Sequence, residues 1–129
     1  MTTTINAVAS TGLVQTSDGS GIIKVQSNGV ATNALAWVNF NGTTSPGTIR
    51  AQYNVSSVTK VGSGQYTVNF TNALADANYC AAVNCDYDGV GGAINAKNFS
   101  TTSCTVQNVL FNLSGYSDHS LNNVTIFGN

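Results

Sequence analysis

Apolar and polar residues alternate along several short segments of the chain, most regularly over residues 65–70. The apolar members of this segment are Tyr66, Val68 and Phe70. A period of two is typical of a β-strand with one buried face. The segment 49–55 has the same period, and its predicted apolar face consists of Ile49, Ala51, Tyr53 and Val55. Between the two segments, residues 60–64 contain two glycines and predict a chain reversal.

The rest of the main body predicts further short strands. We expect them at residues 36–42, 79–85, 93–99, 104–113 and 124–127. The apolar phase changes between Val106 and Val109, which indicates either a β-bulge or a strand buried on both faces. A helical turn is allowed only at 71–78, a segment too short and too rich in Asn for a longer helix. Trp37 and Phe40 are expected in the core or in a subunit interface and not in contact with a ligand, because they lie beside strands with clear apolar faces.

Residues 1–35 differ from this pattern, because they contain no aromatic residue and only short apolar pieces. Two short strands around a Gly-rich turn are predicted at 12–16 and 21–27. Such a hairpin is only marginally stable alone in water, so it needs the main domain, another copy or another protein to pack on. We therefore predict an N-terminal arm for attachment and oligomerisation over 1–35 and a display domain over 36–129. The fold class is all-β, an antiparallel β-sandwich or jelly roll preceded by a short extended or β-hairpin arm.

Charge is scarce, and this narrows the possible partners. Only 7% of the 129 residues are charged, against about 25% in an average soluble domain. Asn, Thr and Ser supply about a third of the chain, well above average usage, so we expect a surface of amides and hydroxyls. The net charge is -1 and the four basic residues are scattered singly, which argues against nucleic-acid binding. We expect no membrane insertion and no signal peptide, because no apolar run is long enough and the first residues lack a basic segment.

The three cysteines predict neither a disulfide framework nor a metal site. Their number is odd, and Cys80 and Cys85 lie five residues apart, so they face opposite sides of a straight strand. This spacing suits neither a redox Cys-x-x-Cys motif nor a zinc site, and the chain has only one His. We expect three buried or half-buried free thiols, formed in a reducing cytoplasm, with no metal and no cofactor.

Residue types found in active sites occur at two places, but neither place has a catalytic signature. Asp86 and Asp88 precede a Gly-rich turn as in a calcium loop, yet a downstream Glu is absent, so a hairpin tip is the favoured interpretation. A glycosidase needs two carboxylates held at a fixed separation, and a Gly-rich loop is not rigid enough to hold them. Asp118 and His119 have serines on both sides, but adjacent residues point apart and no Gly-x-Ser-x-Gly elbow is present. We therefore expect no enzymatic activity.

Several segments carry a resemblance to a known family. They read AWVNFNGT at 36–43, IRA at 49–51, YNVSSV at 53–58, GSGQYTVNF at 62–70 and DANY at 76–79. Together they resemble the C-terminal domain of tail-fibre-like proteins of tailed bacteriophages. Residues 12–21 and 25–29 resemble the short β segments that often precede this domain in phage fibres. The resemblance covers roughly the first two-thirds of the chain, and the sequence beyond Cys80 is idiosyncratic, as expected of a variable tip.

The resemblance implies a virion structural protein, a homotrimer whose β-rich domain displays loops to a host surface. The expected function is that of a short tail fibre or tip, which binds other virion proteins through its arm and a glycan or protein of the host cell surface. The chain would be made in the host cytoplasm and reside in the virion. Since collagen-like, coiled-coil and shaft repeats are absent from the sequence, a capsid fibre or decoration protein without a receptor role is an alternative. A standalone carbohydrate-binding module is a second alternative, and a glycan-depolymerising enzyme ranks last.

Receptor binding is expected in two loops, because loops at the end of a sandwich can change without disturbing its core. Carboxylates accept hydrogen bonds from sugar hydroxyls, and a tyrosine ring can cover the apolar face of a sugar. The residues concerned are Asp86, Tyr87 and Asp88 in the first loop and Tyr116, Asp118 and His119 in the second.

Overall fold

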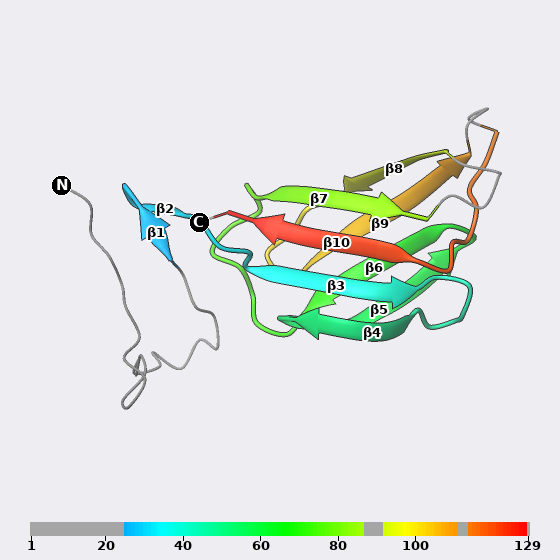
Figure 1. Cartoon of the computed structure of the whole chain (residues 1–129), viewed down its shortest axis with the longest axis horizontal. Helices are drawn as coiled ribbons and strands as arrows, with labels where there is room; N and C mark the ends of the chain where they lie inside the picture. Colours follow the sequence, from blue (N-terminus) through cyan, green and yellow to red (C-terminus); the bar gives the residue numbers. More distant parts are fainter. Residues whose placement is uncertain (1–24, 87–91, 111–113, 129) are drawn as a thin grey trace.

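The computed structural model describes residues 25–86, 92–110 and 114–128. Two antiparallel sheets of four strands each form a β-sandwich (Figure 1). Sheet 1 has the order β4-β3-β10-β7 and sheet 2 the order β5-β6-β9-β8. The strands are β3 (Ala36–Asn41), β4 (Thr48–Tyr53), β5 (Val55–Gly62), β6 (Gln65–Phe70), β7 (Cys80–Cys85), β8 (Gly92–Lys97), β9 (Ser103–Leu110) and β10 (Asn122–Phe127). The predicted sandwich is confirmed, and no described residue lies in a helix, including those of the segment 71–78.

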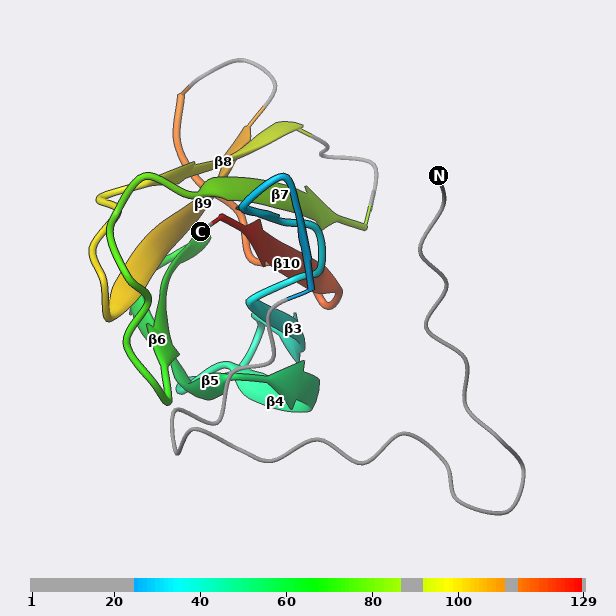
Figure 2. The ribbon, with the colours of Figure 1, turned by 90° about the vertical axis from the view of Figure 1, so that its left-hand side faces the viewer.

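The chain enters and leaves the sandwich at one end. β3 and β10, the first and last strands of the body, are neighbours in sheet 1, with Ala36 opposite Ile126. Viewed from that end, the two sheets are layers that meet along two sides, with β7 beside β8 and β4 beside β5 (Figure 2). The loop 42–47 and the segment 114–121 lie at the opposite end, which we call the loop end (Figure 1).

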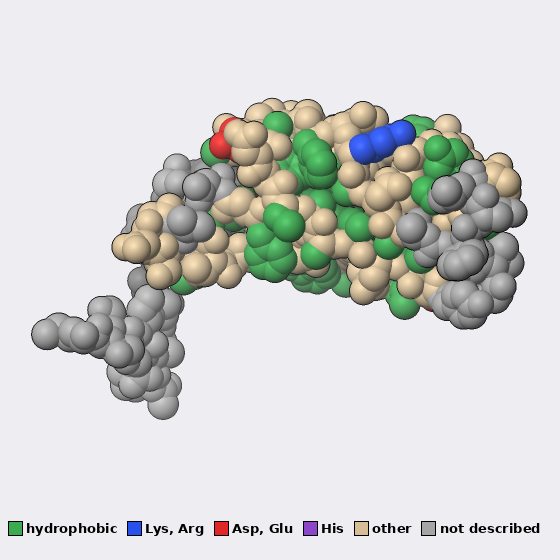
Figure 3. All heavy atoms as spheres, turned by 90° about the horizontal axis from the view of Figure 1, so that it is seen from above, with side chains coloured by type: hydrophobic (Ala, Val, Ile, Leu, Met, Phe, Trp, Pro, Cys, Tyr) green, Lys and Arg blue, Asp and Glu red, His purple; other side chains and the backbone are tan. Residues whose placement is uncertain are grey.

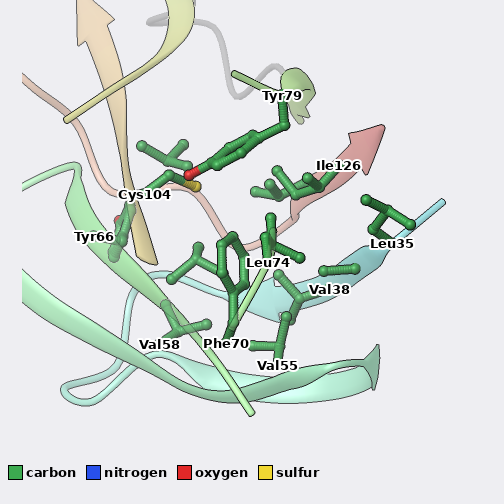
Figure 4. Packing of buried hydrophobic residues seen from close by; sticks show 14 of the residues in the cluster. Leu35, Val38, Val55, Val58, Tyr66, Phe70, Leu74, Tyr79, Cys104 and Ile126 are labelled. Atoms are coloured by element: carbon green, nitrogen blue, oxygen red, sulfur yellow. The ribbon is translucent and has the colours of Figure 1, made fainter. Parts of the chain in front are cut away.

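The core fills the space between the sheets with alternate residues from both of them. In β6, for example, Tyr66, Val68 and Phe70 are buried, as the alternation predicts. Phe40 and Tyr66 come from opposite sheets and meet edge to face with ring centroids 5.1 Å apart. Phe40 is therefore a core residue, as expected. Figure 4 shows further members of the cluster, among them Leu35, Val38, Val55, Val58, Leu74, Cys104 and Ile126.

Asn54 divides the predicted strand 49–55 into two strands in different sheets. Its φ of 53° lies in the left-handed region, which Asn tolerates better than most residues. The buried Asn54 side chain donates to Leu35 O and to Asn72 O, both at 3.2 Å, and accepts from Asn72 N at 2.8 Å. The chain then continues as β5 as far as Gly62. The predicted reversal at 60–64 is correspondingly shorter and consists of the two residues between β5 and β6.

A β-bulge at Arg50 changes which face of β4 is buried. Asn39 lies opposite Ala51 whereas Phe40 lies opposite Ile49, so Arg50 is an extra residue in β4. Because one extra residue exchanges the faces of a strand, Ile49 packs against the core while Ala51 is exposed. The prediction that these residues share one apolar face is therefore wrong.

Trp37 lies on the outer face of sheet 1 and not in the core. Tyr53 pairs directly with it, and directly opposite residues share a face of the sheet. Its exposed fraction is 38%. The expectation of a core position is thus wrong for Trp37, while a subunit interface stays a prediction.

β9 accounts for the change of apolar phase in the segment 104–113. This strand lies between β6 and β8, with continuous register to both. Val106, Gln107 and Asn108 are all buried, so of the two alternatives the strand buried on both faces is confirmed. Their amide nitrogens are paired: Gln107 Nε2 donates to Gln65 Oε1 at 2.6 Å, and Asn108 Nδ2 donates to Asn122 Oδ1 at 2.8 Å. The buried Asn108 Oδ1 has no hydrogen-bond partner among the described residues.

A short hairpin precedes the sandwich. It consists of β1 (Gln26–Ser27) and β2 (Val30–Ala31) around Asn28 and Gly29, whose φ angles of 55° and 80° are those of a tight hairpin turn. The predicted strand 12–16 and most of 21–27 lie outside the described residues. Ala31 and Leu35 are buried with the core, so the last residues of the predicted arm pack on the sandwich.

The three cysteines are free, as predicted, but the expectation that all three are buried or half-buried is wrong for Cys80. Cys80 is exposed on β7 while Cys85, on the other face of the strand, is half-buried. Cys104 is buried, and burial raises the pKa of its thiol to about 11. Burial likewise raises the pKa of Tyr79 to about 12, and the Tyr79 hydroxyl lies 3.0 Å from Ser103 O. None of the described residues belongs to a helix long and apolar enough to span a membrane.

Candidate functional site

Polar side chains converge on Asp118 at the loop end. Its Oδ1 accepts hydrogen bonds from Gly64 N at 2.7 Å and from Tyr66 Oη at 2.8 Å, and its Oδ2 pairs with Lys60 Nζ at 2.5 Å. Lys60 Nζ also donates to Gly42 O at 3.3 Å. One carboxylate thus connects the β5–β6 hairpin to the segment 114–121.

The surroundings keep Asp118 ionised and Tyr66 neutral. Burial alone would raise the pKa of Asp118, but the hydrogen bonds from Gly64, Lys60 and Tyr66 outweigh it and lower that pKa. Tyr66 is fully buried, and burial, followed by the hydrogen bond to Asp118, raises its pKa strongly. A Cβ atom at Gly42 would collide with the Tyr66 side chain, so this close approach requires glycine.

A second group joins the end of β7 to the same segment. His119 is buried, and its Nδ1 lies 3.3 Å from Asp86 Oδ1. Ser120 Oγ donates to Asp86 Oδ2 at 2.6 Å. Burial raises the pKa of Asp86, but the bonds from Ser120 and Leu121 and the charge of His119 lower it overall.

This Ser, His and Asp set does not have the geometry of a nucleophilic triad. In a triad the serine hydroxyl bonds to the histidine, and the carboxylate orients the other face of the ring. Here Ser120 bonds to the carboxylate of Asp86 itself, so the geometry does not pair a nucleophile with a base. In the described part of the chain no group of three or more His, Cys, Asp or Glu is placed to hold a metal ion.

The structure brings together several of the residues predicted to bind a receptor. Asp86, Asp118 and His119 all lie at the loop end, but their side chains contact other residues of the same chain. Tyr116 is 39% exposed and pairs with Val109 through an isolated bridge. Tyr87 and Asp88 lie outside the described residues. Among the described candidates, Tyr116 is the one that presents a large part of its side chain to solvent.

The outer face of sheet 1 holds a second cluster that was not predicted as a site. Three amides form a row across neighbouring strands, the amide row of Asn39, Asn123 and Asn84. Asn39 Nδ2 donates to Asn123 Oδ1 at 2.6 Å, and Asn123 Nδ2 donates to Asn84 Oδ1 at 2.7 Å. Arg50 Nη1 lies 3.5 Å from Asn39 Oδ1, and its Nη2 donates to Ser120 O at 2.7 Å.

One sequence signal could have revealed this face. Trp37 and Phe40 are three positions apart, and residues at odd spacing on a regular strand face opposite sides. Since Phe40 continues the apolar series of Ala36 and Val38, Trp37 has to point outward together with Asn39.

The outer face of sheet 2 is covered by hydroxyls and amides. Asn69 Nδ2, for example, donates to Ser57 Oγ at 3.0 Å and to Thr59 Oγ1 at 3.2 Å. Apolar side chains are also present on the side of the sandwich formed by the edge strands β7 and β8. Hydrophobic side chains lie along its middle and charged ones are few (Figure 3). We call this side the edge seam, and its partly buried apolar residues are Ala81, Val83 and Ile94.

Comparison with known proteins finds no matching family model, no matching curated protein and no matching solved structure.

Proposed function

We propose that the chain is a structural attachment and display protein of a bacteriophage particle, a short tail fibre or fibre tip. This proposal rests on a difference between the two ends of the sandwich. The N-terminal segment joins it at the end where Leu35 N bonds to Ile126 O, and the loops with the polar clusters lie at the opposite end (Figure 1). An arm bound to the particle would therefore direct the loop end outward.

The sequence resemblance supports the same proposal. The similar segments 36–43, 49–51, 53–58 and 62–70 fall on or beside β3 to β6, which form two hairpins of the sandwich. Hydrogen bonds of Asp118 and Asp86 also connect the segments of the loop end to one another. Loops held on a rigid scaffold are the usual place for ligand recognition.

The proposed assembly is a homotrimer, and the edge seam is the surface that favours it. β7 and β8 each have a hydrogen-bonded neighbour on one side only, and unpaired strand edges beside apolar side chains can pair with another chain. Sedimentation velocity at micromolar concentration should give a trimer, and a monomer that persists at high concentration would exclude this assembly.

Electron microscopy of virions tests the proposed location. Particles of the phage that encodes the chain would be incubated with gold-labelled antibodies raised against residues 34–128. Gold at the tail tip is the expected result. Gold on the capsid would instead support the fibre or decoration protein of the capsid, and unlabelled particles would overturn the virion proposal.

A standalone carbohydrate-binding module is the second candidate. Its specific support is the outer face of sheet 1, where an exposed indole lies beside the amide row. A monomer in sedimentation that binds polysaccharide, with no gold on virions, would favour this second function.

A further inference from the structure

We infer that the outer face of sheet 1 binds a neutral oligosaccharide. The inference rests on the proposed role in host recognition, since it names the ligand class and places it on a sheet face. The aromatic–amide face, as we call this surface, consists of Trp37, Tyr53, Arg50 and the amide row.

The aromatic part provides a stacking surface, which gives the exposed Trp37 a ligand contact that was not expected from the sequence. Trp37 lies between Tyr53 on β4 and Thr125 on β10, both in direct register with it. The bulge at Arg50 is what places Tyr53 on this face. Ala82 continues the same row on β7, and the small Thr125 and Ala82 leave the indole accessible. Sugar rings have an apolar C–H face that packs on an aromatic ring.

The amide part provides hydrogen bonds beside the indole. Asn39 is two residues from Trp37 along β3, so the two rows are about 7 Å apart. Neighbouring strands are about 4.8 Å apart, so the amides repeat at short, regular intervals across β3, β10 and β7. The row uses one N–H of Asn39 and one of Asn123, which leaves the second N–H of each amide for a partner outside the row.

The chemistry of this face fits a neutral glycan better than a protein surface. Arg50 is its one charged residue among those described, and no carboxylate belongs to it. Amides buried in a dry protein interface would each need a matching partner, and unpaired ones are costly. A sugar hydroxyl both donates and accepts, so it can pair with amide oxygens or nitrogens and keep water bridges to the remaining groups.

The experiment uses the fact that Trp37 is the only tryptophan of the chain. The full chain would be titrated with short linear oligosaccharides of glucose, mannose, galactose and N-acetylglucosamine and with bacterial O-antigen polysaccharides. At least one of these should shift the tryptophan emission in a saturable way and protect it from acrylamide quenching. Calorimetry should give an affinity at least tenfold weaker for Asn123→Ala and for Trp37→Ala, a change of about 1.4 kcal/mol or more.

Val61→Ala is the matched control, because Val61 is an exposed apolar residue on β5 in the other sheet. It should bind like the wild type, and thermal unfolding verifies that all three variants are folded. Absence of binding to every glycan would overturn the inference, and so would binding without any change in tryptophan emission. Emission that depends on protein concentration, with an oligomer lost in Trp37→Ala, would identify a subunit interface instead. Gold on virions tests the proposed function separately, so the two can fail independently.

Discussion

The carboxylate of Asp118 accepts hydrogen bonds from three elements: from Gly64 N in the turn after β5, from Lys60 Nζ on β5 and from Tyr66 Oη on β6. Hydrogen bonds to an ionised group are roughly twice as strong as those between neutral groups. They also stabilise the segment that carries Asp118, which contains little regular structure between Ser114 and Leu121. A single residue therefore determines much of the order at the loop end.

Asp118→Asn should lower the free energy of unfolding near neutral pH by about 1–2 kcal/mol, because three donors lose an anionic acceptor. The folded chain lowers the pKa of Asp118, so the unfolded state binds the proton more tightly. The stabilisation is complete above the ordinary pKa of 3.8 and is lost as the pH falls through the lower folded value. Urea unfolding between about pH 6 and about pH 2 should show a shallower loss for the variant. Equal pH dependence in the wild type and the variant would contradict the conclusion that ionised Asp118 stabilises the fold.

Truncation of Phe40 should destabilise the fold much more than truncation of Trp37. Phe40→Ala removes a fully buried ring and should cost about 3–5 kcal/mol of unfolding free energy. Trp37→Ala removes a partly exposed ring and should cost distinctly less, because fewer contacts are lost. Chemical denaturation of both variants measures this difference. A larger loss for Trp37→Ala would mean that the indole is covered in solution.

At the scale of elements, the alternation of apolar and polar residues predicts most strands. It does not predict the positions where one extra or left-handed residue exchanges the buried and exposed faces. β6 and β7 follow their predicted ranges closely. The bulge at Arg50 and the left-handed Asn54 each interrupt the period. The bulge has no compositional signal, and an Asn, though uncommon in strands, does not by itself mark the end of one. The alternation therefore does not predict β5 as a strand, and it places Tyr53 on the wrong face.

Asn54 lies where the chain passes from β4 in sheet 1 to β5 in sheet 2, and substitutions there test what stabilises this connection. Asn54→Gly keeps the left-handed backbone but loses the side-chain bonds to Leu35 and Asn72. Asn54→Ala loses the same bonds and also has to adopt a positive φ, which costs about 1 kcal/mol more. Denaturant midpoints should therefore fall in the order wild type, Asn54→Gly, Asn54→Ala. If the alanine variant were as stable as the glycine variant, the left-handed backbone at position 54 would not contribute to the stability of the fold.

For the whole molecule, low charge and regular alternation suffice to predict a β-sandwich with an uncharged surface. The polar clusters could be predicted only as residue types, because their partners are distant in the sequence. Lys60 and Asp118 are 58 positions apart, and no local pattern encodes their pairing. The aromatic–amide face depends in addition on the bulge that brings Tyr53 beside Trp37.

A chain that starts at Ala34 should still fold cooperatively. It loses the β1–β2 hairpin and, among the buried core residues, only Ala31, while Leu35 and the rest remain. Its urea midpoint should lie close to that of the full chain. Under the proposed function, its incorporation into particles should be abolished. A truncated chain that unfolds without cooperativity would show that the hairpin is part of the folding unit, and normal incorporation would assign the arm another role.

The pairing of β3 with β10 has a mechanical consequence. Antiparallel hydrogen bonds run perpendicular to the strands, so a pull between the two chain ends, which lie together at Ala36 and Ile126, opens the ladder one pair at a time. A pull between the N-terminal side and the loop end runs along the strands and strains many bonds at once. Optical tweezers with handles at residues 34 and 115 should therefore require a higher rupture force than handles at residues 34 and 128. Equal forces would rule out this anisotropy, whereas a difference would mean that the domain resists load best along its long axis, between the end where the chain enters and the loop end.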